Sequence, residues 1–184
     1  GSVKGRQIGI RGVVVDTAKA NFTHADNSTN MTVVGTIGDG ALSGYGYIQN
    51  GNIDATISGN ALPLTALSLI IGQDVDGTLN TSFAIQGTLD NPNVMGTVWG
   101  QEVHYKGARF NNIHGDIKLD NHILTITNGH IGDGDGGYDV NGWYNLNTDV
   151  LDLNAKARAA RIENVIRTVT DVPNTGWFET DNHI

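Results

Sequence analysis

The chain has 184 residues, a formal net charge of −8, 25 glycines and no cysteine. The negative charge argues against a nucleic-acid partner, because neutralising phosphates requires clustered lysine and arginine. Without cysteine the chain has no disulfides, thiolate nucleophiles or cysteine-based zinc sites, and no apolar run is long enough for a membrane span. Abundant glycine together with Asn, Asp and Thr predicts an all-β protein of short strands separated by turns.

Alternating apolar and polar residues predict strands along most of the chain. Strands are predicted at residues 13–15, 31–37, 42–48, 53–57, 78–89, 94–99, 113–119, 138–146 and 151–157. The run 113–119 is followed by the turn signal Asp120-Asn121 and by a return strand that begins at Leu124, so this region is expected to form a hairpin. We expect about eleven or twelve strands in all.

Two segments, residues 62–71 and 162–169, carry apolar residues at three- and four-residue spacing and predict short helices. They hold equivalent places in a loose internal repeat, because the pattern of residues 44–85 returns 98 to 99 positions later. Gly44-Tyr45 corresponds to Gly142-Trp143, and Ile53-Asp54 corresponds to Leu151-Asp152. Such repetition is typical of stacked modules that present long surfaces, and it disfavours a single-site enzyme.

The repeat also suggests how the chain is organised. We expect residues 1–2 to be a cloning scar. Residues 3–184 are expected to form one continuous segment of about two diverged repeats, approximately 3–90 and 91–184. The second copy stops where the first runs on, so we interpret the chain as part of a longer protein.

Several polar patterns in the sequence do not predict a functional site. The run Gly132–Gly137 resembles calcium-binding Gly/Asp repeats, but those need tandem copies, so a flexible turn is expected there. His114, His122 and His130 are spaced eight apart without metal-ligand spacing or an acidic partner. Asp133 is interpreted as a solvated turn residue, as are Asp116 and Asp120. No catalytic motif, cofactor motif or metal site is predicted, and we expect the protein not to be an enzyme.

Two phrases in the middle of the chain resemble a known family. Residues 77–96 fit the pattern G-x-L…G-T-L-x-x-P-x-V-x-G, and residues 105–117 fit Y-x-G-x-x-F-x-N-I-x-G-x-I. The order and spacing of these phrases resemble the TamB-type envelope proteins of the AsmA-like superfamily, from bacteria with two membranes. The similarity is best over about residues 60–145.

The resemblance implies a fold and a setting. The fold would be an elongated β-sheet curled into an open U-shaped trough, or β-taco, with an apolar interior. The parent protein would be anchored in the inner membrane and would cross the periplasm to an outer-membrane barrel of the TamA or BamA type. Its implied role is to shield phospholipid acyl chains in a hydrophobic groove during transport between the membranes and to support outer-membrane biogenesis.

Strand periodicity supplies candidate groove residues, because a period-two strand places its apolar side chains on one face. The candidates are Leu79, Phe83, Ile85, Leu89, Ile113, Ile117, Leu119, Leu124 and Ile126. The same residues would also suit the closed core of an ordinary β fold. The alternative function is a structural β-solenoid segment of a surface or secreted adhesin, and a carbohydrate-active β-helix is a weaker third possibility.

Overall fold

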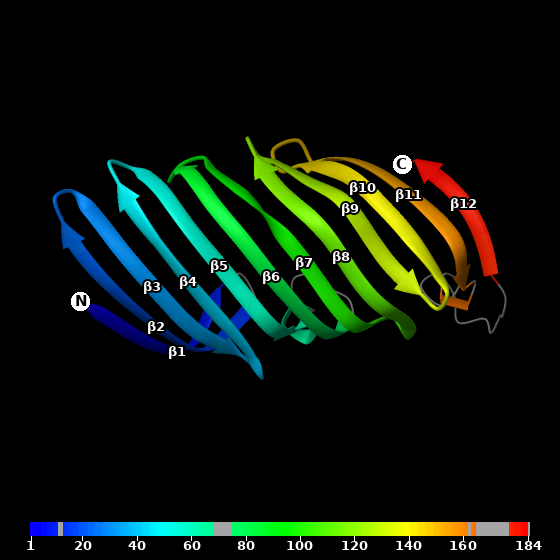
Figure 1. The fold of residues 1–184 in the computed structure, drawn as a ribbon, viewed down its shortest axis with the longest axis horizontal. Coiled ribbons are helices and arrows are strands. Elements are labelled where there is room, and N and C mark those ends of the chain that lie inside the picture. The colour runs from blue at the N-terminus through cyan, green and yellow to red at the C-terminus, as the bar shows by residue number, and fades with distance from the viewer. Residues whose placement is uncertain (11–12, 68–74, 162, 165–176, 184) are drawn as a thin grey trace.

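A computed structural model describes the chain except for residues 11–12, 68–74, 162, 165–176 and 184. Twelve antiparallel strands form one open sheet, in which every strand pairs with its neighbours in sequence. The strands are β1 (Ser2–Ile10), β2 (Val13–Ala25), β3 (Ser28–Ile37), β4 (Gly40–Gln49), β5 (Asn52–Pro63), β6 (Val75–Thr88), β7 (Pro92–Tyr105), β8 (Ala108–Asp120), β9 (Ile123–Asp133), β10 (Gly136–Asn145), β11 (Val150–Arg161) and β12 (Trp177–His183). They lie side by side along the longest axis, with the termini at opposite ends (Figure 1).

The all-β prediction is confirmed, and so is the hairpin of β8 and β9, which turns at residues 121–122. Strand β1 was not predicted, because Gly5 and Gln7 occupy positions beside Lys4 and Arg6 where an alternating strand would carry apolar side chains. The glycine-rich run also differs from expectation. Strand β9 continues to Asp133 and β10 begins at Gly136, so only two residues separate the strands there.

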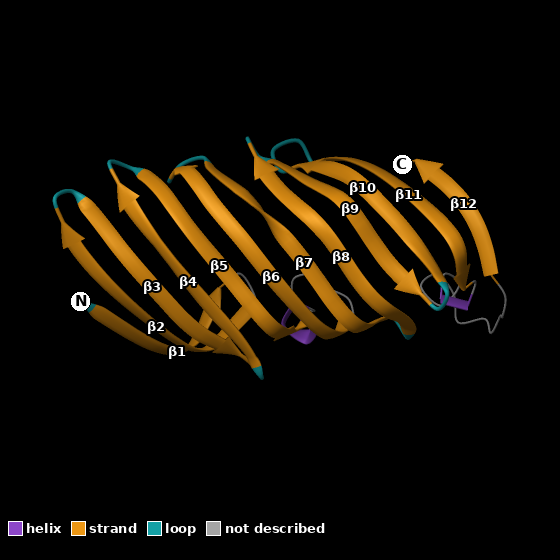
Figure 2. Cartoon of the chain, in the orientation of Figure 1, coloured by secondary structure: helices purple, strands orange, loops and turns teal. Residues whose placement is uncertain are grey.

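The prediction of two short helices is not supported. Of the predicted helix 62–71 the structure describes residues 62–67; Leu62 and Pro63 end strand β5, and Leu64–Leu67 form one 3-10 turn, η1, drawn purple in Figure 2. Leu62 pairs with Leu79 of β6, so cross-strand pairing prevails over the helical spacing of a short apolar run. The second predicted helix lies largely outside the described residues, which include only Glu163 and Asn164 of it.

A series of irregularities crosses the sheet near one end of its strands. Five non-glycine residues inside strands have positive φ angles, and all of them except Gln7 lie at a shift of the strand register, which marks a bulge. They are Gln7, Ala61, Glu102, Asn128 and Ala159. In β5, for example, the register shifts between Gly59 and Leu62, so the extra residue returns Leu62 to the face that Gly59 occupies. Because each bulge adds one residue, apolar side chains before and after it lie on the same face of the sheet although an odd number of positions separates them in the sequence.

Replacing Ala61 by glycine should stabilise the protein by about 0.5–1 kcal/mol, because an L-residue at φ 49 is strained and glycine is not. The matched change Ala41→Gly, in the regular part of β4, should destabilise the protein by a similar amount. Chemical denaturation of both variants measures the two effects. Destabilisation by both changes would contradict the strain at Ala61.

The sheet has little conventional core. Among the described residues the buried hydrophobic side chains are Val15, Leu64, Val103, Ala108, Ala157 and Ala160. The accessible surface is 11448 Å², whereas a compact protein of this mass would expose about 8,500 Å². The sequence is long enough to bury a sizeable core, but a single layer of strands does not do so.

Candidate functional site

One face of the sheet is apolar from β2 to β11. Residues directly opposite each other on antiparallel neighbours point to the same side of a sheet. Following the register across ten strands gives one row of Ala20, Val33, Gly44, Ile57, Phe83, Gly96, Ile117, Ile126, Gly142 and Leu153. An adjacent row contains Phe22, Met31, Gly46, Ala55, Ile85, Val94, Leu119, Leu124, Tyr144 and Leu151. These two rows define what we call the apolar face.

The opposite side, the polar face, has a different composition. The row between the two apolar rows contains Asn21, Thr32, Tyr45, Thr56, Ala84, Met95, Lys118, Thr125, Trp143 and Asp152. Tyr45 and Trp143, which correspond in the sequence repeat, both lie on this face and are exposed. This face is therefore more polar than the apolar face, but it also exposes large side chains such as Met95.

The register brings together eight of the nine predicted groove residues. Phe83 and Ile117 face each other across Gly96 of β7, and Ile85 and Leu119 face each other across Val94. Leu79 and Ile113 likewise flank Gly100, while Leu124 and Ile126 of β9 pair with Leu119 and Ile117. Leu89 is the exception, because it lies in the turn after β6, outside the strand pairing, and is 53% exposed.

Sequence reasoning missed much of this face. Its N-terminal part, which includes Val33, Leu42, Ile53 and Ile57, lines an apolar hollow of about 300 Å³ over β1–β6. The signal was present, because these strands alternate as clearly as β6 does, but only the central strands were assigned to the face. The apolar side chains here are only partly covered: Ile57 is 40% exposed.

Glycines on the apolar face mark close approaches of neighbouring strands. A Cβ placed on Gly96 would clash with the carbonyl oxygen of Ser82 and the ring of Phe83, and one on Gly142 would clash with the carbonyl oxygen of Asp152. At Gly46 a Cβ would lie 2.5 Å from the Cβ of Ala55. Because these glycines have no side chain, atoms of the neighbouring strands lie closer to them than a Cβ would allow.

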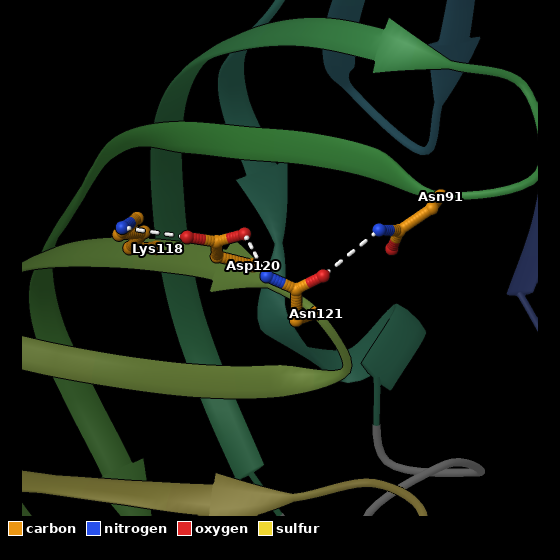
Figure 3. Close-up of polar contacts among 4 residues, drawn as sticks. All are labelled: Asn91, Lys118, Asp120 and Asn121. Carbon is orange, nitrogen blue, oxygen red and sulfur yellow. Dashed lines mark hydrogen bonds and ion pairs between the residues drawn. The ribbon is translucent and has the colours of Figure 1, made fainter.

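A ladder of hydrogen bonds joins the turns along one long rim of the sheet. Each turn bonds to the next, through Asn27–Asn50 at 2.9 Å, Gly51–Leu89 at 3.0 Å, Asn91–Asn121 at 3.0 Å and His122–Leu146 at 2.8 Å. Figure 3 shows the third link, where Asn121 also donates to Asp120, which pairs with Lys118. These links hold neighbouring hairpins together beyond the strand ladder itself.

At the opposite rim, Asp133 binds Arg161, the last residue of β11, and Asn164, which follows that strand. Its carboxylate accepts hydrogen bonds from the Arg161 backbone at 2.9 Å, from the Asn164 side chain at 2.5 Å and from the Tyr138 hydroxyl at 3.2 Å. Asn164 also bonds to both backbone groups of Arg109. Asp133 is fully buried, so its interpretation as a solvated residue of a flexible turn was wrong. Its partners come from distant positions that only the fold brings together.

This cluster predicts sensitivity to alkaline pH. Burial, followed by the charge and hydrogen bond of Asp133, raises the pKa of Tyr138 above its ordinary value of 10.0. A raised pKa contributes stability that is present below pH 10 and is lost as the pH rises toward the folded-state pKa. The free energy of unfolding should therefore fall above about pH 10, and Tyr138→Phe, which cannot ionise, should weaken this dependence. Urea denaturation at a series of pH values compares the two proteins, and identical slopes would contradict the prediction.

The histidines form a pair without a metal site. His114 and His130 are opposite each other on β8 and β9, with ring centroids 5.4 Å apart. His130 bonds to Asp139 of β10 at 2.9 Å, and this hydrogen bond lowers the pKa of Asp139. The expectation that these histidines lack an acidic partner was therefore wrong for His130. No group of three or more potential ligand side chains gathers among the described residues.

No protein-family model, curated protein or solved structure matches the chain. Within the described part of the chain, no helix has the length and apolar character needed to cross a membrane.

Proposed function

We propose that this chain is a non-enzymatic segment of a TamB-type bridge protein that shields phospholipid acyl chains along its apolar face. The observation that carries the proposal is the continuous apolar row across ten strands, which no second layer covers among the described residues. Exposed apolar surfaces of this extent on soluble proteins mark sites for apolar partners. An acyl chain is such a partner, and it suits a face whose two rows carry a single polar side-chain group, the Tyr144 hydroxyl, which is bonded to Asp149.

The energetics favour holding a lipid without trapping it. Each methylene transferred from water to this face contributes about 0.8 kcal/mol. Side chains along the rows are mostly medium-sized aliphatic residues and glycines, so successive positions offer similar contacts. With strands about 4.8 Å apart, twelve strands extend the face by about 50–60 Å. A lipid can therefore slide along the face with its tails shielded.

We further propose that the sheet curls toward its apolar face to form an open trough. Two features support this curvature: the close approaches at Gly46, Gly96 and Gly142, and the series of bulges near one rim. Glycine kinks and bulges are the usual means by which sheets acquire curvature. The curl would cover the tails of a bound lipid on two sides.

The wider setting is proposed from the resemblance alone. In it, the parent protein lies in the periplasm, is anchored in the inner membrane and passes phospholipid toward an outer-membrane barrel of the TamA or BamA type. The adhesin alternative is less well supported, because stacked solenoid coils produce parallel strand pairing, whereas every pair described here is antiparallel.

Photo-crosslinking with phospholipid tests the proposed function. A benzophenone side chain is placed at Phe83 on the apolar face and, as a control, at the adjacent Ser82 on the polar face. Asn80 also lies on the polar face but is not used as the control, because its side chain accepts a hydrogen bond from the Ala61 backbone at 2.9 Å. Mass spectrometry should detect a phospholipid adduct at position 83 and little at position 82. Absence of adducts at both positions, or equal labelling, would overturn the proposal.

A further inference from the structure

A basic hollow lies on the polar face at the N-terminal end of the sheet. Lys4 and Arg6 come from the edge strand β1 and Lys19 from β2, where Lys4 and Lys19 are directly opposite each other. Arg6 is opposite Thr17, whose hydroxyl oxygen lies 2.8 Å from that of Thr36. These five residues are among those that line a hollow of about 550 Å³ over β1–β3.

The positive charge of the hollow is not neutralised by the protein. The chain carries a net charge of −8, yet none of the ion pairs within the described residues involves Lys4, Arg6 or Lys19. The neighbouring Asp16 carboxylate accepts hydrogen bonds from the Gln7 side chain at 2.8 Å and the Gly38 backbone at 2.6 Å, and it forms no ion pair with these cations within the described residues. Like charges directly opposite in a sheet are destabilising, so the Lys4–Lys19 pair favours an anion between the two ammonium groups.

Protection of the sheet edge does not account for this arrangement. Lysines on an edge strand discourage pairing with other chains, which would explain Lys4. Lys19, however, lies on β2, which is paired on both sides. The Thr17–Thr36 hydroxyl pair beside Arg6 leaves one neutral hydrogen-bond donor, which edge protection does not require.

We propose that this hollow binds the phosphate group of an anionic ligand. The two ammonium groups act as point charges, and the Arg6 guanidinium offers a planar fork that matches two phosphate oxygens. One hydroxyl of the Thr17–Thr36 pair can donate to a remaining oxygen, because the other donates within the pair. The ligand is a free phosphate compound or the headgroup of an anionic phospholipid. The site is separate from the apolar face, because it opens on the other side of the sheet.

Binding measurements with two kinds of phosphate source test this site. Pyrophosphate is titrated by isothermal calorimetry, and co-sedimentation is measured with phosphatidylglycerol vesicles and with phosphatidylcholine vesicles. The double variant Lys4→Gln/Lys19→Gln is compared with Lys106→Gln/Arg109→Gln, which changes the net charge equally near the β7–β8 turn. The first variant should weaken binding at least tenfold and the second less than twofold.

The outcomes separate the two sources. Lysine-dependent binding of pyrophosphate supports a free phosphate ligand. Lysine-dependent binding of phosphatidylglycerol vesicles alone supports a lipid headgroup. Vesicle binding that is equal for both lipids, or that is equally weakened by both double variants, overturns the proposal, as does the absence of binding to either source. Circular dichroism of each variant establishes that loss of binding does not reflect loss of the sheet.

Discussion

Replacing Ile57 by aspartate should reduce phospholipid binding at least tenfold while costing only about 1–2 kcal/mol of stability. Ile57 lies in the middle of the apolar face and lines its hollow. Because its side chain is 40% exposed in the free protein, little burial is lost on substitution. A bound acyl chain would cover the position, so a carboxylate there must be desolvated against hydrocarbon.

The adjacent change Ser58→Asp provides the matched control. Ser58 lies on the polar face and pairs with Ser43 and Ser82, so the new carboxylate has no charged residue directly opposite. Retention of a fluorescent phospholipid, measured beside thermal unfolding, compares the two variants. Equal loss of lipid from both would mean that charge rather than the apolar face governs binding. Unchanged binding by the Ile57 variant would contradict the proposed occupant.

Gly96→Ala should destabilise the protein by about 2–3 kcal/mol, a large effect for one added methyl group. The methyl would clash with the carbonyl oxygen of Ser82 and with Phe83, so β6 and β7 would have to separate. A backbone carbonyl in a strand ladder cannot move aside as a flexible side chain can. The substitution is therefore expected to lower the free energy of unfolding of the whole sheet.

The control is Gly115→Ala in β8, where the nearest atom to the new Cβ is the Gly129 Cα at 3.5 Å. This is ordinary contact, and the substitution should change stability by less than about 0.5 kcal/mol. Denaturant titration gives both values. Similar effects at the two glycines would show that Gly96 does not mark a special approach of the strands.

The sequence predicted one strand pairing, the β8–β9 hairpin, and the structure shows the same pairing of neighbours along all twelve strands. Short connections between consecutive strands, such as Asp120-Asn121 before β9, favour antiparallel pairing of neighbours. The alternation of Leu79, Phe83 and Ile85 likewise determines which side chains share a face. These are local properties, so composition and periodicity predict them well.

The bulges limit that prediction. In β9, Ile126 and Ile131 are five residues apart and would lie on opposite faces of a regular strand, but the bulge at Asn128 returns them to one face. A change of parity in the sequence signals that an irregularity exists. It does not say whether the strand ends or bulges, because that depends on how the partner strands pair.

The sequence by itself determined an all-β chain with one apolar and one polar set of side chains. Only the tertiary structure decided that the described strands form one open sheet with no second sheet against it, because whether a face meets a second sheet depends on distant packing rather than on local pattern. The same is true of Asp133, whose partners Arg161 and Asn164 are 28 and 31 residues away. Contacts between distant residues leave no periodic trace, and for that reason periodicity missed them.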